Sequence, residues 1–144
     1  MAVRKKTTDE LLKLISKETN INQFLNTNQK EFENLSLCDE LNTLLDKYQI
    51  TKADIIRLSN LDKIYVYQIF DGTKRNPSRN KLLALCLAIG SNLEETQKIL
   101  WLGHSEKLYP RTVRDSVIIY AIEHKTSVTQ LNNTLFDMHM DILS

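Results

Sequence analysis

The chain has 144 residues, of which 42% are hydrophobic and 26% charged, and its formal net charge is +1. Such a chain is long enough to bury one proper core and a small additional helical unit. No apolar run approaches the roughly 18 to 20 residues that cross a bilayer, and no apolar signal core follows the basic residues 4–6. We therefore expect a cytoplasmic protein with no membrane association.

Helix start and stop signals divide the chain into short elements. Gly72, Gly90 and Gly103 each follow a periodic apolar segment, which predicts a left-handed helix end at each glycine. Pro110 suits the first turn of a further helix. Four capping pairs predict helix starts: Thr7 with Glu10, Thr51 with Asp54, Asn92 with Glu95, and Ser127 with Gln130.

No segment shows the sustained alternation of a β-strand, so the predicted fold class is all-α. We predict helices near residues 8–17, 21–33, 38–48, 52–59, 62–70, 79–89, 93–102, 110–124 and 128–137.

The predicted helices 52–59 and 62–70 are separated by a turn of about three residues. Asn60 lies where a sharp turn requires a positive φ, which Asn tolerates well, and Asp62 is a natural N-cap for the second helix. The apolar residues of the pair fall where two crossed helices would face a common core. These residues are Ile55, Leu58, Leu61, Val66 and Ile69.

This helix pair, the segment 74–78 and the apolar helix 82–90 together resemble the XRE/Cro family of repressor-like helix-turn-helix domains. The resemblance continues to a helix start at residues 92–95 and covers about 65 residues, from 39 to 103. It implies a five-helix domain that binds DNA as a transcriptional regulator. Ile56 departs from the family's usual small Ala and is expected to push apart or tilt the two helices; Asn60 replaces the usual Gly.

The segment 108–115 and the apolar residues 117–119 are similar to those of a bacterial subset of this family, mainly from Gram-positive bacteria. In that subset an N-terminal helical extension and a C-terminal helical pair bracket the motif. The implied organisation is an extension at 1–37, the helix-turn-helix domain at 38–103 and the helical pair at 104–144. The resemblance also implies an association with Ser/Thr protein kinases.

If helix 62–70 lies in a major groove, its outward positions contact bases: Lys63, Ile64, Tyr65 and Gln68. The expected phosphate contacts are Lys52, Lys74, Arg75 and Arg79. Residues 50–90 carry seven lysines and arginines against three aspartates, a local charge of +4, which suits a face that meets double-stranded DNA.

Ile64, Tyr65 and Tyr67 are unusually apolar for a base-reading surface. The alternative is therefore an adaptor that uses the helix pair to bind a protein, such as a Ser/Thr protein kinase. Apolar stripes in 8–33 and 110–137 predict a homodimer held by the N- or C-terminal helices, although the same surfaces would suit an adaptor.

The sequence contains no other residue pattern that predicts a metal, redox or catalytic site. His104, His124 and His139 have no partner at ligand spacing, and Cys38 and Cys86 match no metal or redox pattern. No phosphate loop, nucleophile elbow or catalytic carboxylate pair is present, so we expect neither an enzyme nor a cofactor.

Overall fold

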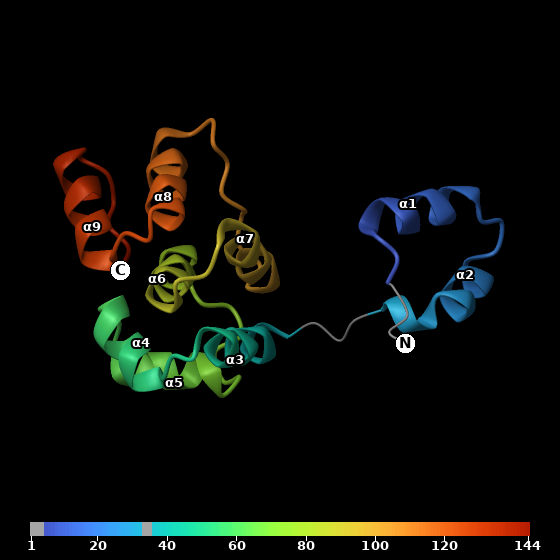
Figure 1. Cartoon of the computed structure of the whole chain (residues 1–144), viewed down its shortest axis with the longest axis horizontal. Helices are drawn as coiled ribbons and strands as arrows, with labels where there is room; N and C mark the ends of the chain where they lie inside the picture. The colour runs from blue at the N-terminus through green and yellow to red at the C-terminus, as the bar shows by residue number, and fades with distance from the viewer. Residues whose placement is uncertain (1–4, 33–35) are drawn as a thin grey trace. The chain divides into compact units, whose positions relative to one another are not determined.

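The computed structural model describes residues 5–32 and 36–144. In these residues the secondary structure consists of nine α-helices and one 3-10 helix, without a strand, which confirms the all-α class. Contacts divide the chain into two compact units, Met1–Asn34 and Leu35–Ser144, which are drawn in blue and in cyan to red (Figure 1). No helix within the described ranges is long and apolar enough to cross a membrane.

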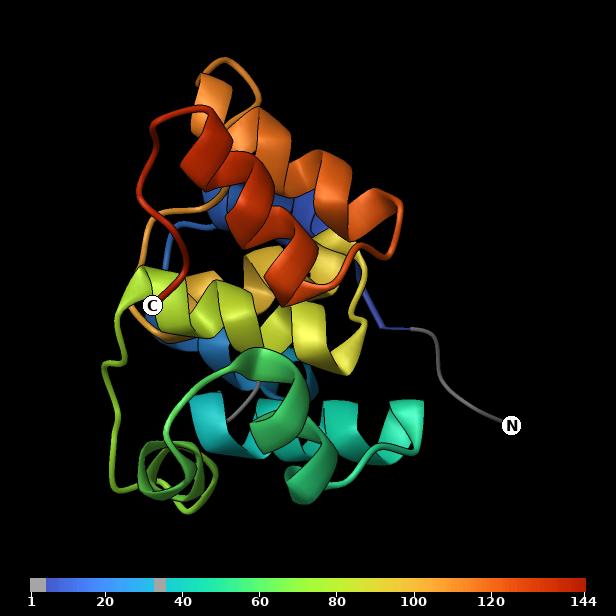
Figure 2. The ribbon, with the colours of Figure 1, turned by 90° about the vertical axis from the view of Figure 1, so that its left-hand side faces the viewer.

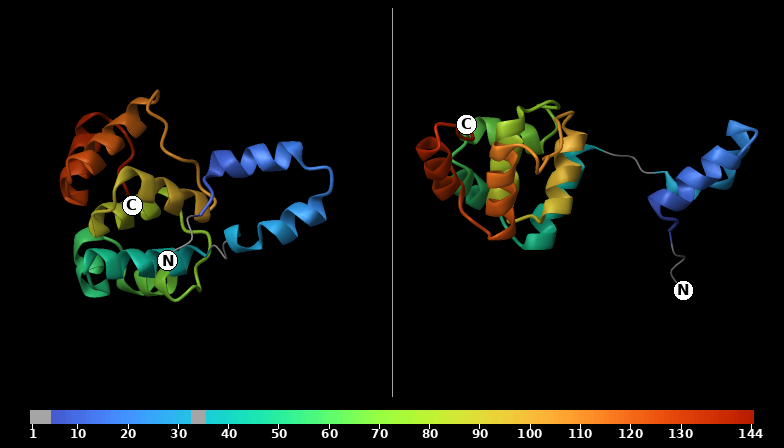
Figure 3. Two further views of the ribbon diagram at one scale, coloured as in Figure 1. Left: turned by 45° about the vertical axis from the view of Figure 1, so that its right-hand side comes forward. Right: turned by 90° about the horizontal axis from the view of Figure 1, so that it is seen from above.

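The N-terminal unit is a helical hairpin of α1 (Thr8–Lys17) and α2 (Ile21–Thr27), followed by a 3-10 turn at Gln29–Glu31 (Figure 3). The predicted helix 21–33 is wrong from residue 28 to residue 32, and its last residue, 33, lies outside the described part of the chain. The Phe24 carbonyl accepts hydrogen bonds of 3.0 Å from both the backbone N–H and the side chain of Asn28, which caps the end of the helix there.

The larger unit contains seven helices: α3 (Leu37–Tyr48), α4 (Lys52–Ser59), α5 (Lys63–Phe70), α6 (Arg79–Ile89), α7 (Leu93–Leu102), α8 (Val113–Glu123) and α9 (Val128–Asp137). Figure 2 shows α6 in the middle of this unit, with α3, α4 and α5 on one side and α8 and α9 on the other. Seven residues of α6 are buried, including Leu82, Leu83 and Leu85, because other helices of the unit pack on several sides of α6.

The C-terminal pair shares this core. Ile118 of α8 and Leu131 and Leu135 of α9 are buried in the same apolar cluster as Leu82 of α6. Residues 104–144, which the sequence sets apart as a helical pair, therefore complete the core of the larger unit instead of forming one of their own.

Two predicted helix ends differ in the structure. Helix α8 begins at Val113, so Pro110 lies before its first turn. The Pro110 carbonyl accepts a hydrogen bond of 2.6 Å from the Ser116 hydroxyl. Gly103 has φ −85°, and the left-handed residue is the next one, His104, at φ 58°. A Cβ on Gly103 would lie 2.5 Å from Cδ1 of Leu82, so glycine provides space there.

Candidate nucleic-acid interface

The turn between α4 and α5 has the predicted geometry. Asn60 adopts the left-handed conformation at φ 61°, and the Asp62 carboxylate accepts a hydrogen bond of 3.2 Å from the Tyr65 N–H. The Ser59 hydroxyl accepts from the Leu61 N–H at 3.2 Å, which satisfies a further turn donor. Both predictions, the positive φ of Asn60 and the cap at Asp62, are confirmed.

The inner faces of the two helices are apolar, as predicted, with one exception. Ile55, Val66 and Ile69 are fully buried, whereas Leu58 is 36% exposed. Ile56 is half-buried and packs on the core cluster. These contacts attach α5 to the core by one side and leave its other side in solvent.

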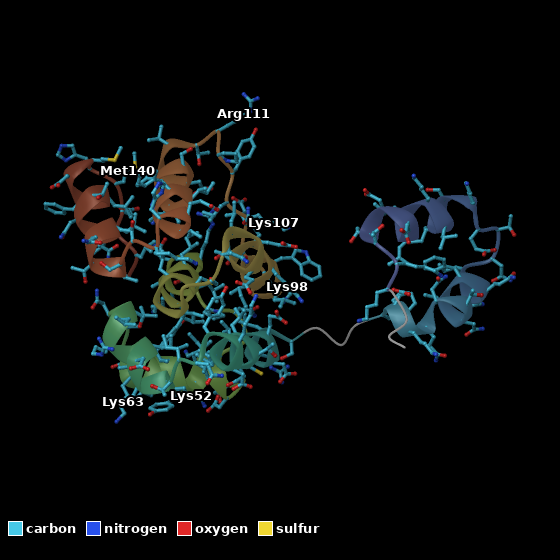
Figure 4. The ribbon with its side chains drawn as sticks, in the orientation of Figure 1. Lys52, Lys63, Lys98, Lys107, Arg111 and Met140 are labelled. Atoms are coloured by element: carbon cyan, nitrogen blue, oxygen red, sulfur yellow. The ribbon has the colours of Figure 1, made fainter. Side chains whose placement is uncertain are left out.

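The outward side of α5 presents Lys63, Ile64 and Tyr67. Ile64 is 67% exposed and Tyr67 is 42% exposed, and Lys63 points away from the domain beyond the α4–α5 pair (Figure 4). Tyr65 and Gln68, which the sequence places among the base contacts, are half-buried, and Tyr65 packs on the core. Tyr67 is the outward tyrosine that the predicted set omits.

Lysines from four segments surround the aromatic rings of α5. The Lys52 Nζ of α4 lies 5.9 Å from the Phe70 ring centroid, and the Lys63 Nζ lies 6.0 Å from that of Tyr67. The Tyr65 ring has two such neighbours, the Nζ of Lys74 at 5.6 Å and that of Lys81 at 4.1 Å. Cation–π attraction of this kind holds an ammonium group beside a ring without neutralising its charge.

Lys81 was not predicted as a site residue. It lies in the first turn of α6, and only the fold brings it beside Tyr65. We call Lys52, Lys63, Lys74, Arg75 and Lys81 the basic cluster; in the described part of the chain none of them forms a salt bridge with a carboxylate, although the charge of Lys52 helps to lower the pKa of Asp71.

The loop after α5 carries Lys74 and Arg75, whose side chains are both exposed. The Lys74 N–H donates to the Gln68 carbonyl at 3.0 Å, which folds the loop back onto α5. The Thr73 N–H donates to Asp71 at 2.8 Å, and hydrogen bonding with Thr73 lowers the pKa of that carboxyl. A cavity of about 460 Å³ opens beside this loop. Its lining consists of Ser36, Leu37, Cys38, Asp71, Gly72, Lys74, Arg75, Leu102 and His104.

Arg79, predicted to contact phosphate, has a different role. Its guanidinium donates to both carboxylate oxygens of Asp115, at 2.9 and 3.1 Å, and to the carbonyls of Glu106 and Lys107. The pair is mostly buried, with the Asp115 side chain 11% exposed. Because these internal acceptors occupy its donors, Arg79 joins α6 to the α7–α8 connection and is not part of the basic cluster.

Arg57 of α4 pairs with Asp54 at 3.4 Å, and Arg111 and Arg114 lie away from the basic cluster. Arg114 donates to the Asn80 side chain at 2.7 Å and to the Asp141 carbonyl at 3.1 Å, so it ties the C-terminal segment to α6. Arg111 projects from the α7–α8 connection, at the opposite end of the larger unit from Lys63 (Figure 4). Within the described ranges no group of three His, Cys, Asp or Glu side chains is placed to hold a metal ion.

Comparison of the chain with protein-family models, curated proteins and solved structures finds no match in any of the three. The functional inference therefore rests on the geometry of α4, α5 and the loop that follows them. Two properties of this region matter most: the exposed side of α5 and the unpaired cations around it.

Proposed function

We propose that the protein is a sequence-specific DNA-binding transcriptional regulator of the XRE/Cro type. In this proposal α3 to α7 form the five-helix domain, α4 and α5 are its helix-turn-helix, and α5 enters the major groove. The observation that carries the proposal is the basic cluster, in which cations from three other segments, together with Lys63 of α5 itself, lie beside the aromatic rings of a helix that is exposed on one side. Unpaired cations that border a projecting helix suit a duplex with phosphates on both sides of its groove.

The roles of the residues follow from their exposure. Lys63 and Ile64 are exposed on α5 and would meet base edges, Lys63 by donating to guanine and Ile64 by contacting a thymine methyl. Gln68 would pair with adenine from its half-buried position. Lys52, Lys74 and Arg75 would contact phosphates, and Lys81 joins them in place of Arg79.

Two copies of the protein would bind one operator. Repressor-like domains read half-sites about one helical turn apart, and each α5 offers only eight residues, too few to specify a long site alone. A homodimer with two-fold symmetry is therefore part of the proposal.

The deciding experiment is a selection of genomic DNA fragments followed by titration at two salt concentrations. Lys74→Ala/Arg75→Ala should weaken binding to every sequence and flatten the slope of log K against log salt by up to about 1.8, at roughly 0.9 per lost phosphate contact. Gln68→Ala should act mainly on the selected sequence, by about 1 to 3 kcal/mol.

Lys107→Ala/Arg111→Ala is the matched control, because it removes two charges from the α7–α8 connection, away from the end of the unit where Lys52 and Lys63 lie (Figure 4). It should leave both affinity and salt slope near the wild-type values. Failure of any fragment to bind better than bulk DNA at low salt would refute the transcription-factor proposal.

The second candidate function is a protein adaptor, with a Ser/Thr protein kinase as one such partner. The exposure of Ile64 and Tyr67 on the same side of α5 favours it, since exposed apolar and aromatic side chains are typical of protein interfaces. Under this alternative, Tyr67→Ala abolishes capture of a partner, while DNA binding stays weak and independent of sequence.

A further inference from the structure

The hairpin of α1 and α2 leaves most of its apolar side chains in solvent. Helix α1 buries none of its residues, and Phe24 is the one apolar side chain that is buried in the described part of the N-terminal unit. Six large apolar side chains are between 39% and 61% exposed: Leu12, Leu14, Ile15, Ile21, Leu25 and Phe32.

A unit of this size is not expected to be stable with that surface uncovered. Below about 40 residues, a folded unit usually depends on disulfides, metals or association, because it buries too little apolar surface. The Phe24–Phe32 edge contact, with ring centroids 6.2 Å apart, is its one aromatic pair among the described residues. The hairpin therefore requires a partner surface.

The C-terminal helices differ from the hairpin because they have a core to hold them. Ile118, Ala121 and Ile122 of α8 and Leu131 and Leu135 of α9 are buried in the core of the larger unit. Val113, Tyr120 and Phe136 of this flank are also 61%, 63% and 74% exposed, but the helices that carry them are held by the core. Of the two flanks that the sequence offers for self-association, the N-terminal one exposes its apolar side chains with almost no core of its own.

We propose that the α1–α2 hairpin is the homodimerisation element, and that its partner is the same hairpin of a second copy. The requirement for a partner surface follows from the exposed apolar side chains of the hairpin and does not depend on the proposed function. The choice of a second copy rests on the proposed function, because two half-sites require two copies joined by a surface other than α5.

The available area agrees with a dimer. The exposed parts of the six side chains add up to about three fully exposed large side chains, or roughly 500 Å² in each copy. Two such faces bury on the order of 1,000 Å², which is the lower limit of specific interfaces. A weak to moderate dimer, concentrated further by binding to adjacent half-sites, is the expected result.

The charges of α1 leave its apolar face free to associate. Asp9, Lys13 and Lys17 are spaced four residues apart and so form one row on the helix; Lys13 and Lys17 lie about 160° around the axis from Ile15, and Asp9 lies about 120° from it. All three are exposed. Pairing centred on Ile15 would therefore leave Lys13 and Lys17 on the far side of the helix and Asp9 at the edge of the contact, while Glu10 caps the start of the helix with Thr7. This limits the large cost of burying an unpaired ion at an interface.

Sedimentation of the full chain over a concentration series tests the proposal. The wild type should dimerise below about 100 µM, and Leu12→Ser/Ile15→Ser should weaken dimerisation at least tenfold. The matched control is Val113→Ser/Phe136→Ser, which removes side chains 61% and 74% exposed on α8 and α9, and it should remain dimeric. A monomeric wild type, or a dimer lost only in the control, would overturn the proposal.

A second measurement does not depend on how the variants fold. Intermolecular methyl contacts in a mixed sample of isotopically labelled and unlabelled wild type should come from Leu12, Ile15 and Ile21. Contacts from Val113 or Ile64 instead would place the interface elsewhere and overturn the proposal.

The outcome is separable from that of the DNA proposal. Dimerisation through the hairpin without selective DNA binding would refute the regulator and leave the dimer element in place. Selective DNA binding by a monomer, or by a dimer that tolerates Leu12→Ser/Ile15→Ser, would refute the dimer element and leave the regulator.

Discussion

The side-chain amide of Asn60, in the turn between α4 and α5, donates a hydrogen bond of 3.2 Å to the Thr129 hydroxyl of α9. The turn of the proposed DNA-reading pair is thus held by a helix almost seventy residues later in the chain. Asn60 has two separable functions: it adopts a positive φ and it makes this long-range contact.

Substitutions at Asn60 should separate these functions. Asn60→Gly keeps the left-handed turn and loses the amide, so its free energy of unfolding should stay within about 0.5 kcal/mol of the wild type. Asn60→Ala loses both and should cost about 1 kcal/mol more, because alanine is strained at positive φ. Urea denaturation measures the difference, with Thr129→Val as the control for the hydrogen bond. Equal stability of the Gly and Ala variants would contradict the assignment.

The Arg79–Asp115 pair should matter for stability and not for DNA contact. Arg79→Ala leaves a mostly buried carboxylate without its two main donors, and Asp115→Asn removes the charge that Arg79 faces. Either change should lower the free energy of unfolding by about 2 kcal/mol. Neither should change the salt slope of DNA binding when the folded fraction is taken into account. A flatter salt slope for Arg79→Ala would contradict this prediction and indicate that Arg79 contacts a phosphate.

The same pair predicts a dependence on pH. Burial alone would raise the pKa of Asp115, but hydrogen bonds from Arg79 and the Tyr109 backbone outweigh it and hold the pKa below its usual 3.8. The carboxylate therefore contributes stability above pH 3.8, and this contribution is lost as the pH falls through the lower pKa of the folded state. The difference in unfolding free energy between wild type and Asp115→Asn should be constant near neutrality and narrow below about pH 4. A difference that widens on acidification would contradict this sign.

Gly103→Ala should be destabilising for lack of space. Its φ of −85° suits alanine, but the new Cβ would lie 2.5 Å from Cδ1 of the fully buried Leu82. Overpacking of this kind costs about 1 to 3 kcal/mol. In a double-mutant cycle with Leu82→Ala, the two changes should cost less together than the sum of each alone. The control is Gly90→Ala. A Cβ at residue 90 would meet no neighbouring atom, so the only cost there is the strain of alanine at φ 82°, and this variant should show no coupling to Leu82.

The two cysteines should differ sharply in reactivity. Cys86 is fully buried, and burial raises the pKa of its thiol to about 12, whereas the Cys38 side chain is partly exposed. An alkylating reagent at neutral pH should modify one thiol per native chain and two after denaturation, as mass spectrometry would show. Equal modification of Cys38 and Cys86 in the native protein would contradict the buried position of Cys86.

Much of the fold was predictable because the local signals agree with the global structure. The caps at Thr51, Asp62 and Asn92 act within three residues of themselves, so the sequence alone predicts the helices that they begin. Gly103 was misread because a glycine after a helix signals either a left-handed residue or a close contact. Only the packing of Leu82 distinguishes these two cases.

The candidate site was less predictable, because its composition depends on tertiary contacts. Lys81 is distant from α5 in sequence, and Arg79, two residues earlier, faces Asp115 instead. Helical periodicity also fails to separate Tyr65 from Tyr67, since a helix of eight residues is too short to establish its inner side. Charge patterning thus located the basic region but could not distinguish the surface cations from the internal one.

The core that α8 and α9 share with α6 has a consequence for how the chain can evolve. Residues 5–32 bury little and contribute nothing to the cluster of Leu82, Ile118 and Leu131, so recombination can replace that segment and leave the remaining core intact. The last forty residues cannot be exchanged in this way. Any replacement for α9 must supply side chains that fit against α6, so we expect the two ends of the chain to diverge at very different rates.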